Sequence, residues 1–327
     1  MAPPPPIPVG RIAPSPTGWL HLGHARSFLI AWWHARSRGG RVLLRIEDLD
    51  RDRVKPGMTE ACLRDLEWLG IDWDGPVHVQ SRETEALHAA LAHLLGRGLA
   101  YACTCSRRDL ELALCAPHAE DRESRYPGTC RGRFASPEEA ERASGRPAGI
   151  RFLVCAGPLA LADGFAGPFE VDVAAESGDF LIARRDGAFA YQLAVVVDDA
   201  RMGVTEVVRG ADLLSSTGRQ WLLQEALGLS HSAWFHVPLV VDEQGRRLAK
   251  RRGSATLAEL RASGADPRRV VAWAAKSAGQ TSAELVSARE VAQDFDLDRV
   301  PHAPVTARAG RLDSPPTRDS LSGPLPR

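Results

Sequence analysis

The order of predicted elements in the first fifty residues constrains the fold of this chain more than any other feature. The segment Val9–Ala13 predicts a short strand, which ends in the turn-rich segment 14–18 (PSPTG). Apolar side chains then recur at helical spacing over residues 22–33, and the largely apolar segment Val42–Ile46 predicts a second strand. A strand, a loop, a helix and a strand in this order predict the opening of a parallel-sheet nucleotide-binding unit.

Two histidines stand at the predicted start of that helix. His21 and His24 flank the pair Leu22-Gly23, and a helix N-terminus offers N–H groups and a positive dipole end that favour phosphate oxygens. Imidazole donors at this place would stabilise charge on a transferring phosphate, and Gly23 would let adenine lie close to the backbone. The simpler alternative is a helix with two surface histidines, which is the commoner origin of an isolated H-x-x-H pattern.

A basic loop supplies a further candidate phosphate ligand. The segment 245–253 (GRRLAKRRG) is bounded by glycines and contains Lys250. Lysine otherwise occurs only at Lys55 and Lys276, whereas the remaining 38 of the 41 basic residues are arginine. The segment can be read as a plain solvated loop, or as a loop in which Lys250 brings a mobile point charge to the phosphates of ATP.

Composition excludes several classes of protein. With 327 residues, 44% hydrophobic and 25% charged, the chain has the make-up of a soluble globular protein of one large or two modest domains. It contains no apolar run of about 18 residues, and its proline-rich start lacks the pattern of a signal peptide. Six cysteines are too few for a disulfide scaffold in a chain of this length. We therefore expect a cytoplasmic protein with no membrane partner.

The rest of the chain alternates between short predicted helices and strands. A capping box at Ser136, with Pro137 and Glu139, predicts the start of one helix. Further helices are expected over 59–69, 83–95, 217–227, 257–262 and 267–277, and strands over 150–154, 169–173, 180–183, 190–197 and 235–241.

Several motifs together resemble a known enzyme family. The HLGH element at His21–His24 and the RLAKR element around Lys250 resemble the HIGH and KMSKS signatures of class I aminoacyl-tRNA synthetases. The strings RIAPSPTGWLHLGHAR, RIEDLD, YQLAVVVDD and TEVVRGADLL resemble the glutamyl/glutaminyl branch. The resemblance runs from about Val9 to about Gly279, which is nearly all of the chain predicted to be ordered.

The resemblance implies an α/β fold: a Rossmann-type nucleotide-binding domain, an inserted zinc-containing acceptor-binding subdomain and a helical stem-contact region. We expect a flexible N-terminus (1–8), the first half of the catalytic domain (9–100), the insertion (101–177), the second half of the catalytic domain (178–245), the lysine loop with a helical region (246–298) and a disordered tail (299–327).

A glutamate site must satisfy two carboxylates and one ammonium, so it needs arginines and at least one carboxylate. Arg11, Glu47, Tyr191 and Arg209 stand at predicted strand ends and offer such groups. Each also has a structural alternative. Arg11 could be an edge residue and Glu47 a helix cap or an ion-pair partner, while Tyr191 could belong to the core and Arg209 to a turn. The resemblance implies glutamate contacts at these positions and along the stretch that follows the first arginine, namely Arg11, Ile12, Ala13, Pro14, Ser15, Glu47, Tyr191 and Arg209.

The chemistry that the resemblance implies needs no covalent enzyme nucleophile. The α-carboxylate of glutamate attacks the α-phosphate of ATP, which gives glutamyl-adenylate and pyrophosphate. His21, Gly23, His24 and Lys250 would bind ATP, with the two histidines and the lysine also catalytic, and Mg²⁺ would accompany the nucleotide.

The insertion contains a candidate metal site. Cys103 and Cys105 precede a polar segment with Cys115, His118, Tyr126 and Cys130, and such a segment commonly needs a metal to stabilise it. Spacing alone suggests Cys103, Cys105 and Cys130 with either Cys115 or His118. The resemblance favours Cys103, Cys105, Tyr126 and Cys130 around one structural Zn²⁺, although the stretch before Tyr126 is longer than in the family. Buried hydrophobic cysteines are the alternative, and Cys62 and Cys155 are expected to be packing residues.

The acceptor follows from the predicted extent of the chain. Ordinary glutamyl-tRNA synthetases carry a large anticodon-binding region after the lysine loop, whereas only about 50 residues predicted to be ordered follow Lys250 here. The pattern is similar to the glutamyl-queuosine tRNA(Asp) synthetases, which transfer glutamate to the queuosine base in the anticodon loop. We expect queuosine-bearing tRNA(Asp), ATP and L-glutamate as partners of a monomer. The alternatives are a truncated glutamyl-tRNA synthetase that charges the 3′ end, and an inactive module that binds tRNA or ATP.

Overall fold

The structure of the protein is a computed structural model that describes residues 7–106, 108–109, 125–155, 157–248 and 255–307. The elements up to residue 171 are β1 (Val9–Ile12), α1 (Leu22–Arg36), β2 (Arg41–Ile46), α2 (Met58–Trp68), β3 (His78–Val79), η1 (Gln80–Arg82), α3 (Glu85–Gly96), β4 (Ala100–Cys103), α5 (Pro137–Ser144), β5 (Gly149–Phe152), β6 (Leu159–Asp163) and β7 (Gly167–Val171). The later elements are α6 (Val173–Glu176), β8 (Leu181–Ala183), α7 (Tyr191–Arg201), β9 (Glu206–Gly210), η2 (Ala211–Ser216), α8 (Thr217–Leu227), β10 (Ala233–Val237), β11 (Val240–Val241), α9 (Leu257–Ala262), α10 (Pro267–Ser277), α11 (Ala288–Gln293), η3 (Leu297–Arg299) and β12 (Val305–Thr306).

Parallel strand pairs form the base of the nucleotide-binding half, which confirms the predicted fold class. β1 pairs with β2, with Arg11 opposite Leu43, and β2 pairs in parallel with the short β3. β9 pairs in parallel with β10, so that Arg209 lies opposite His236. β9 also lies beside β1, as shown by the hydrogen bond that Arg11 Nη1 donates to the Val208 carbonyl at 3.3 Å. The carboxyl ends of strands from both halves of the chain therefore meet.

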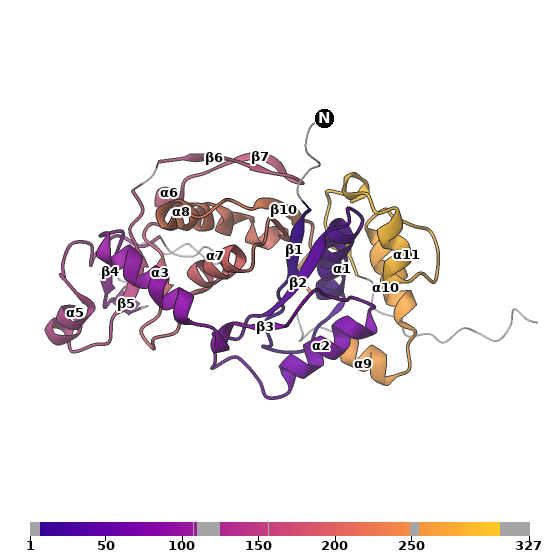
Figure 1. Cartoon of the computed structure of the whole chain (residues 1–327), viewed down its shortest axis with the longest axis horizontal. Helices are drawn as coiled ribbons and strands as arrows, with labels where there is room; N and C mark the ends of the chain where they lie inside the picture. Colours follow the sequence, from indigo (N-terminus) through magenta and orange to yellow (C-terminus); the bar gives the residue numbers. More distant parts are fainter. Residues whose placement is uncertain (1–6, 107, 110–124, 156, 249–254, 308–327) are drawn as a thin grey trace, which may run out of the picture.

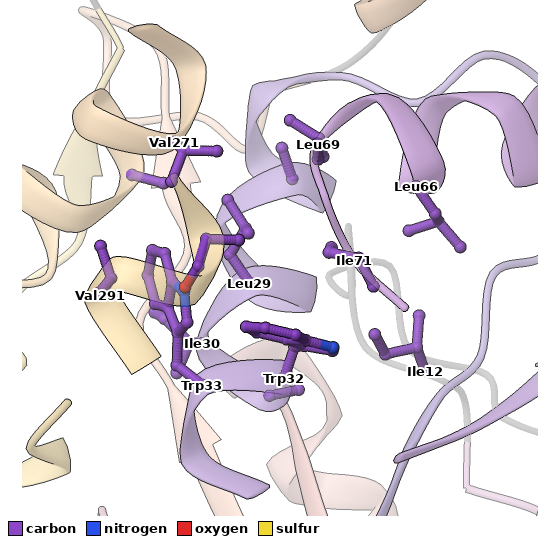
Figure 2. Close-up of a cluster of buried hydrophobic side chains, with 14 of the residues drawn as sticks. Ile12, Leu29, Ile30, Trp32, Trp33, Leu66, Leu69, Ile71, Val271 and Val291 are labelled. Carbon is purple, nitrogen blue, oxygen red and sulfur yellow. The ribbon is translucent and has the colours of Figure 1, made fainter. Parts of the chain in front are cut away.

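Helix α1 has almost no polar face because it is buried on two sides. One side packs on β1, β2 and β9, and the other on α10 and α11 (Figure 1). Figure 2 shows Trp32 and Trp33 projecting from α1 into this core, beside Leu66 of α2 and Val291 of α11. The Trp33 indole N–H donates to the Ala288 carbonyl at 2.9 Å, so its buried polar atom has a partner.

An ion-pair group fastens the end of α1 to β9. Arg38 Nη1 donates to Glu206 Oε1 at 2.9 Å, and His34 Nε2 lies 3.3 Å from Glu206 Oε2. Burial raises the pKa of Glu206, but the contacts with His34 and Arg38 outweigh it and lower the pKa to about 2. Glu206 therefore stays ionised in the folded protein down to strongly acidic pH.

A second lobe of the molecule, seen at the left of Figure 1, has a hydrophobic core of its own. Its antiparallel sheet has the order β4-β5-β8, and α3, α7 and α8 pack against one another within the same core. The predicted boundary at residue 177 cuts this sheet, since β8 lies beyond it and pairs with β5. Strand pairing between distant segments is set by packing, so local sequence does not show which strands share a sheet.

The structure corrects three sequence predictions. Residues 190–197, predicted as a strand, begin helix α7, which is buried over most of its length and so lacks a polar stripe. The predicted disordered tail starts too early, because Val300 is 1% exposed in the main core and β12 pairs with β11. Cys155, expected to be packed, is exposed.

Most other predicted elements are present. The helices predicted over 217–227, 257–262 and 267–277 have those bounds in α8, α9 and α10. At the start of α5, Ser136 Oγ accepts from the Glu139 N–H, but Glu139 Oε2 accepts from Ala135 N–H, so the reciprocal half of the capping box is shifted by one residue. Throughout the described ranges, each helix is too short or too polar to span a lipid bilayer.

Candidate functional site

The two predicted histidines cap the start of α1. His21 is the N-cap residue, and its Nδ1 accepts from the Gly23 N–H at 3.1 Å, while His24 Nδ1 accepts from the His21 N–H at 3.2 Å. In a neutral imidazole an accepting Nδ1 leaves the proton on Nε2, so both rings carry an Nε2–H donor. The ring centroids lie 3.8 Å apart. Two imidazole donors at a helix N-terminus are suited to phosphate oxygens.

Gly23 lies against one of these rings. A Cβ at this position would lie 3.0 Å from His21 Cε1 and 3.6 Å from Val240 Cβ. A larger residue would therefore displace the imidazole. This is a packing reason for glycine, in addition to the contact with adenine, which stays a prediction.

Lys250 lies outside the described residues, but both ends of its loop are placed. Before the loop, the Leu248 N–H donates to the Val240 carbonyl at 3.3 Å. After the loop, Thr256 forms an antiparallel bridge with His21, and the Leu257 N–H donates to the Leu20 carbonyl at 2.9 Å. The chain on either side of the loop thus returns to the start of α1 and to β11.

The four side chains predicted to bind glutamate come from four elements and lie in one place. Arg11 lies in β1, Glu47 directly follows β2, Tyr191 begins α7 and Arg209 lies in β9. Poor access of water raises the pKa of Tyr191, Glu47 raises it further, and Arg209 and Arg11 oppose this. Geometry also brings Arg11, Glu47 and Arg209 together, because β9 packs beside β1 and an ion-pair chain connects Arg11 with Glu47. Tyr191 is 38% exposed, whereas Arg11 and Arg209 are 7% and 5% exposed, so the tyrosine is the most accessible of these three side chains.

The loop after β1 borders the same place. The Glu47 N–H donates to the Pro14 carbonyl at 3.0 Å, which fixes the loop against the end of β2. Ser15 is exposed and Ala13 is half-buried, so both are accessible. Ile12 is 2% exposed and its side chain belongs to the main core, so only its backbone can face a ligand.

The sequence did not single out Arg45 and Asp199, which hold the charges of the pocket in place. Arg45 Nη2 lies 3.0 Å from Glu47 Oε1, and its Nη1 lies 2.5 Å from Asp199 Oδ1. Asp199 Oδ1 in turn lies 3.5 Å from Arg11 Nε. Burial raises the pKa of Glu47, and this rise is larger than the lowering caused by Arg45 and Arg11. Arg45 lies in the string RIEDLD and Asp199 in the string YQLAVVVDD, so the resemblance of these two strings to the family could have indicated both residues.

Arg209 is held by polar groups from α8 and β10. Its Nη1 donates to Gln220 Oε1 at 2.7 Å, its Nη2 to Thr217 Oγ1 at 3.1 Å, and its Nε to His236 Nε2 at 2.8 Å. Gln220 is itself oriented, because its Nε2 donates to Gln192 Oε1 at 3.0 Å. Burial lowers the pKa of Arg209. The guanidinium is therefore fixed in direction within a buried polar network.

The predicted metal ligands also come together. Among the described residues, Cys103, Cys105 and Cys130 form a cluster whose sulfur atoms all lie within 4.8 Å of one another. Cys105 Sγ lies 3.5 Å from Cys130 Sγ, and Tyr126 Oη lies 3.4 Å from Cys103 Sγ and 3.8 Å from Cys105 Sγ. A tetrahedral zinc with Zn–S bonds of about 2.3 Å places its ligand atoms roughly 3.5–3.8 Å apart. The four side chains thus fit one Zn²⁺, while Cys115 and His118 lie outside the described residues.

A buried arginine from β5 borders this cluster. The Arg151 guanidinium carbon lies 3.7 Å from the centroid of the Tyr126 ring, and Arg151 Nε donates to Cys103 Sγ at 3.3 Å. Its Nη1 donates to the Asp179 carbonyl at 2.7 Å. Three thiolates and a phenolate around Zn²⁺ carry net negative charge, which this cation would offset.

Comparisons with known proteins agree with this arrangement. Residues 9–314 match the family described as tRNA synthetases class I (E and Q), catalytic domain. A glutamyl-Q tRNA(Asp) synthetase of Symbiobacterium thermophilum is 47% identical over 307 residues, covering 90% of this chain and 94% of that protein. One of Nitratidesulfovibrio vulgaris is 45% identical over 278 residues, covering 83% of this chain and 86% of that protein.

Among solved structures, a glutamate tRNA ligase from Elizabethkingia meningosepticum in complex with its amino acid is similar at a TM-score of 0.79. It is 28% identical, and the likeness covers 93% of this chain and 68% of that chain. Fold, motif positions and sequence identity over most of the chain all agree. The chain therefore belongs to the class I (E and Q) tRNA synthetases, a family of ligases, and within it to the glutamyl-Q tRNA(Asp) synthetase group.

Proposed function

We propose that this protein activates L-glutamate with ATP and transfers the glutamyl group to the queuosine base in the anticodon loop of tRNA(Asp). The observation that carries the proposal is its 47% identity to a glutamyl-Q tRNA(Asp) synthetase along 94% of that relative. The clustering of Arg11, Glu47, Tyr191 and Arg209 supports the choice of glutamate.

Charge accounts for the choice of amino acid. Arg11 and Arg209 offer guanidinium groups to the two carboxylates of glutamate, and Glu47 with Asp199 offers negative charge to its ammonium. Arg45 bridges Glu47 and Asp199, so the acidic side of the pocket is fixed before the ligand arrives. A preformed pocket of this kind loses little entropy on binding.

Activation is an in-line displacement at phosphorus. A carboxylate oxygen of glutamate attacks the α-phosphorus of ATP, an O–P bond forms, and the bond to pyrophosphate breaks. The Nε2–H groups of His21 and His24 and the ammonium of Lys250 would stabilise the phosphate charge, and Mg²⁺ bound with ATP adds positive charge. The protein contributes position and electrostatics and forms no covalent bond with the substrate.

Transfer is acyl chemistry on the adenylate. A hydroxyl of the cyclopentene-diol of queuosine attacks the glutamyl carbonyl carbon, an ester bond forms, AMP leaves, and the hydroxyl proton is released. A Zn²⁺ held by Cys103, Cys105, Tyr126 and Cys130 would be structural, because it would connect the end of β4 to the segment 126–130.

The test uses labelled glutamate, ATP and two tRNA preparations, from cells with and without queuosine. We expect label only on tRNA that carries queuosine, and we expect tRNA(Asp) trimmed of its 3′-terminal adenosine to accept label equally well. Label that requires the 3′-terminal adenosine would establish a glutamyl-tRNA synthetase of ordinary type. Absence of glutamate-dependent exchange between pyrophosphate and ATP would indicate an inactive binding module.

A further inference from the structure

We propose that Asp163 and His236 form a positioning pair that fixes the orientation of Arg209 and thereby sets the affinity of the pocket for glutamate. The inference rests on the proposed function, because it takes Arg209 to contact the substrate. Neither Asp163 nor His236 belongs to the motifs that the sequence singled out.

Hydrogen bonds determine which nitrogen of His236 carries the proton. His236 Nδ1 lies 2.6 Å from Asp163 Oδ2, and the side chains of both residues are fully buried. An ionised carboxylate only accepts, so Nδ1 must carry the proton. Nε2 is then unprotonated, and its lone pair accepts a hydrogen bond from Arg209 Nε at 2.8 Å.

The electrostatics keep this imidazole neutral. Burial lowers the pKa of His236, and although Asp163 opposes this, Arg209 adds to the lowering. Burial raises the pKa of Asp163, but hydrogen bonds from the His236 ring and from backbone N–H groups outweigh it and lower the pKa overall. A carboxylate, a neutral imidazole and a guanidinium therefore form one chain of hydrogen bonds in which each donor has an acceptor.

The fold brings Asp163 to this place through the β6–β7 hairpin. Asp163 Oδ1 accepts from the backbone N–H groups of His236, Phe165 and Ala166 at 3.0, 3.0 and 2.7 Å. Next to it, the Gly164 N–H donates to the Trp234 carbonyl at 2.7 Å. The hairpin is thus fixed on β10, in which His236 lies opposite Arg209 of β9.

Asp163→Asn tests the pair while keeping both side-chain shapes. The asparagine oxygen can still accept from the backbone, but its amide nitrogen then faces His236 Nδ1, which must become an acceptor. The proton moves to Nε2, and two N–H donors oppose each other at Arg209. The same reversal of tautomer follows the Asp→Asn change in the serine-protease triad.

The readout is the KM for glutamate in ATP–pyrophosphate exchange. We expect Asp163→Asn to raise it by about tenfold to a hundredfold, the effect of losing a hydrogen bond to a charged group, with the KM for ATP unchanged. Asp172→Asn is the matched control, because Asp172 accepts from the Ala175 N–H, and in the described part of the chain its carboxylate has no histidine partner. An unchanged KM for glutamate in a folded Asp163→Asn protein would overturn the inference.

Two replacements of His236 provide a second comparison. In His236→Gln the amide oxygen can occupy the place of Nε2 and accept from Arg209, so the KM for glutamate should remain within a few-fold of wild type. In His236→Asn the shorter amide can replace Nδ1 beside Asp163 but cannot replace Nε2 as the acceptor for Arg209. The KM for glutamate should therefore rise as in Asp163→Asn. Equal KM values for the two variants would contradict a positioning role.

Nitrogen-15 NMR of labelled histidine reads the tautomer without any activity. Wild-type His236 should show a protonated Nδ1 and an unprotonated Nε2, and Asp163→Asn should show the reverse. A wild-type ring protonated on Nε2 would refute the pair. If wild type itself lacks glutamate-dependent exchange, the proposed function fails, while the NMR result still decides whether the tautomer is set by Asp163.

Discussion

Arg151 provides a sharp test of the metal centre. Replacement by methionine keeps the length of the side chain but removes the guanidinium. The guanidinium carbon lies 3.7 Å from the centroid of the Tyr126 ring, and Nε lies 3.3 Å from Cys103 Sγ. Arg151 is 6% exposed, so water cannot readily take its place. Arg151→Met should therefore weaken zinc binding.

The magnitude follows from the contacts that depend on the metal. A hydrogen bond to a charged group contributes about 1.5–3 kcal/mol, and Cys103 is charged once it binds zinc. The bond from Arg151 to the Asp179 carbonyl is lost in metal-free and zinc-bound protein alike, so it cancels in the affinity. The expected effect is roughly a tenfold to hundredfold rise in the Kd for Zn²⁺.

Competition with a chelator of known affinity measures this Kd at constant pH. Arg131→Met is the matched control, because its guanidinium is 49% exposed and pairs with the Asp179 carboxylate rather than with the sulfur cluster. Arg151→Lys should give an intermediate Kd, since an ammonium keeps the charge but not the planar stack. Equal Kd values for wild type and Arg151→Met would refute the role of Arg151. A wild-type protein that does not bind Zn²⁺ would refute the metal site itself.

Lys250→Ala should reduce the rate of glutamate-dependent pyrophosphate exchange by about tenfold or more, while Lys276→Ala, a change elsewhere in the chain, should not; equal rates would exclude the role of Lys250. Glu206→Gln removes a carboxylate whose pKa is lowered from 4.5 to about 2 on folding. The stabilising effect of the ionised carboxylate is complete above the unfolded pKa and disappears as the pH falls through about 2. Urea unfolding should therefore show a difference in stability between wild type and Glu206→Gln that shrinks over this pH range, and a constant difference would contradict the prediction. Gly164→Ala would place a Cβ 2.1 Å from Phe235 Cε1, and thermal unfolding should show a loss of about 1–3 kcal/mol; unchanged stability would mean that the hairpin shifts freely.

Local signals predicted much of the secondary structure. The helix over 257–262 begins at a capping box, and the helix over 267–277 begins with an aspartate cap and a proline. The predicted strand over 190–197 was wrong because α7 is buried on both sides, and a run of valines without a polar face has no helical period to detect. The ordered part of the tail was missed because β12 is only two residues long.

The sequence by itself determined the family, the histidines at the start of α1 and the Cys-x-Cys pair, since each is carried by short motifs whose own residues are close together in the chain. Tertiary structure alone decided that Arg45 joins Asp199, 154 residues away, and that Asp163 joins His236, 73 residues away. Arg151 and Cys103, 48 residues apart, are the corresponding case at the metal cluster. The physical reason is that a buried charge or donor takes its partner from whichever element packs against it, and that choice is made by the core rather than by the neighbouring residues.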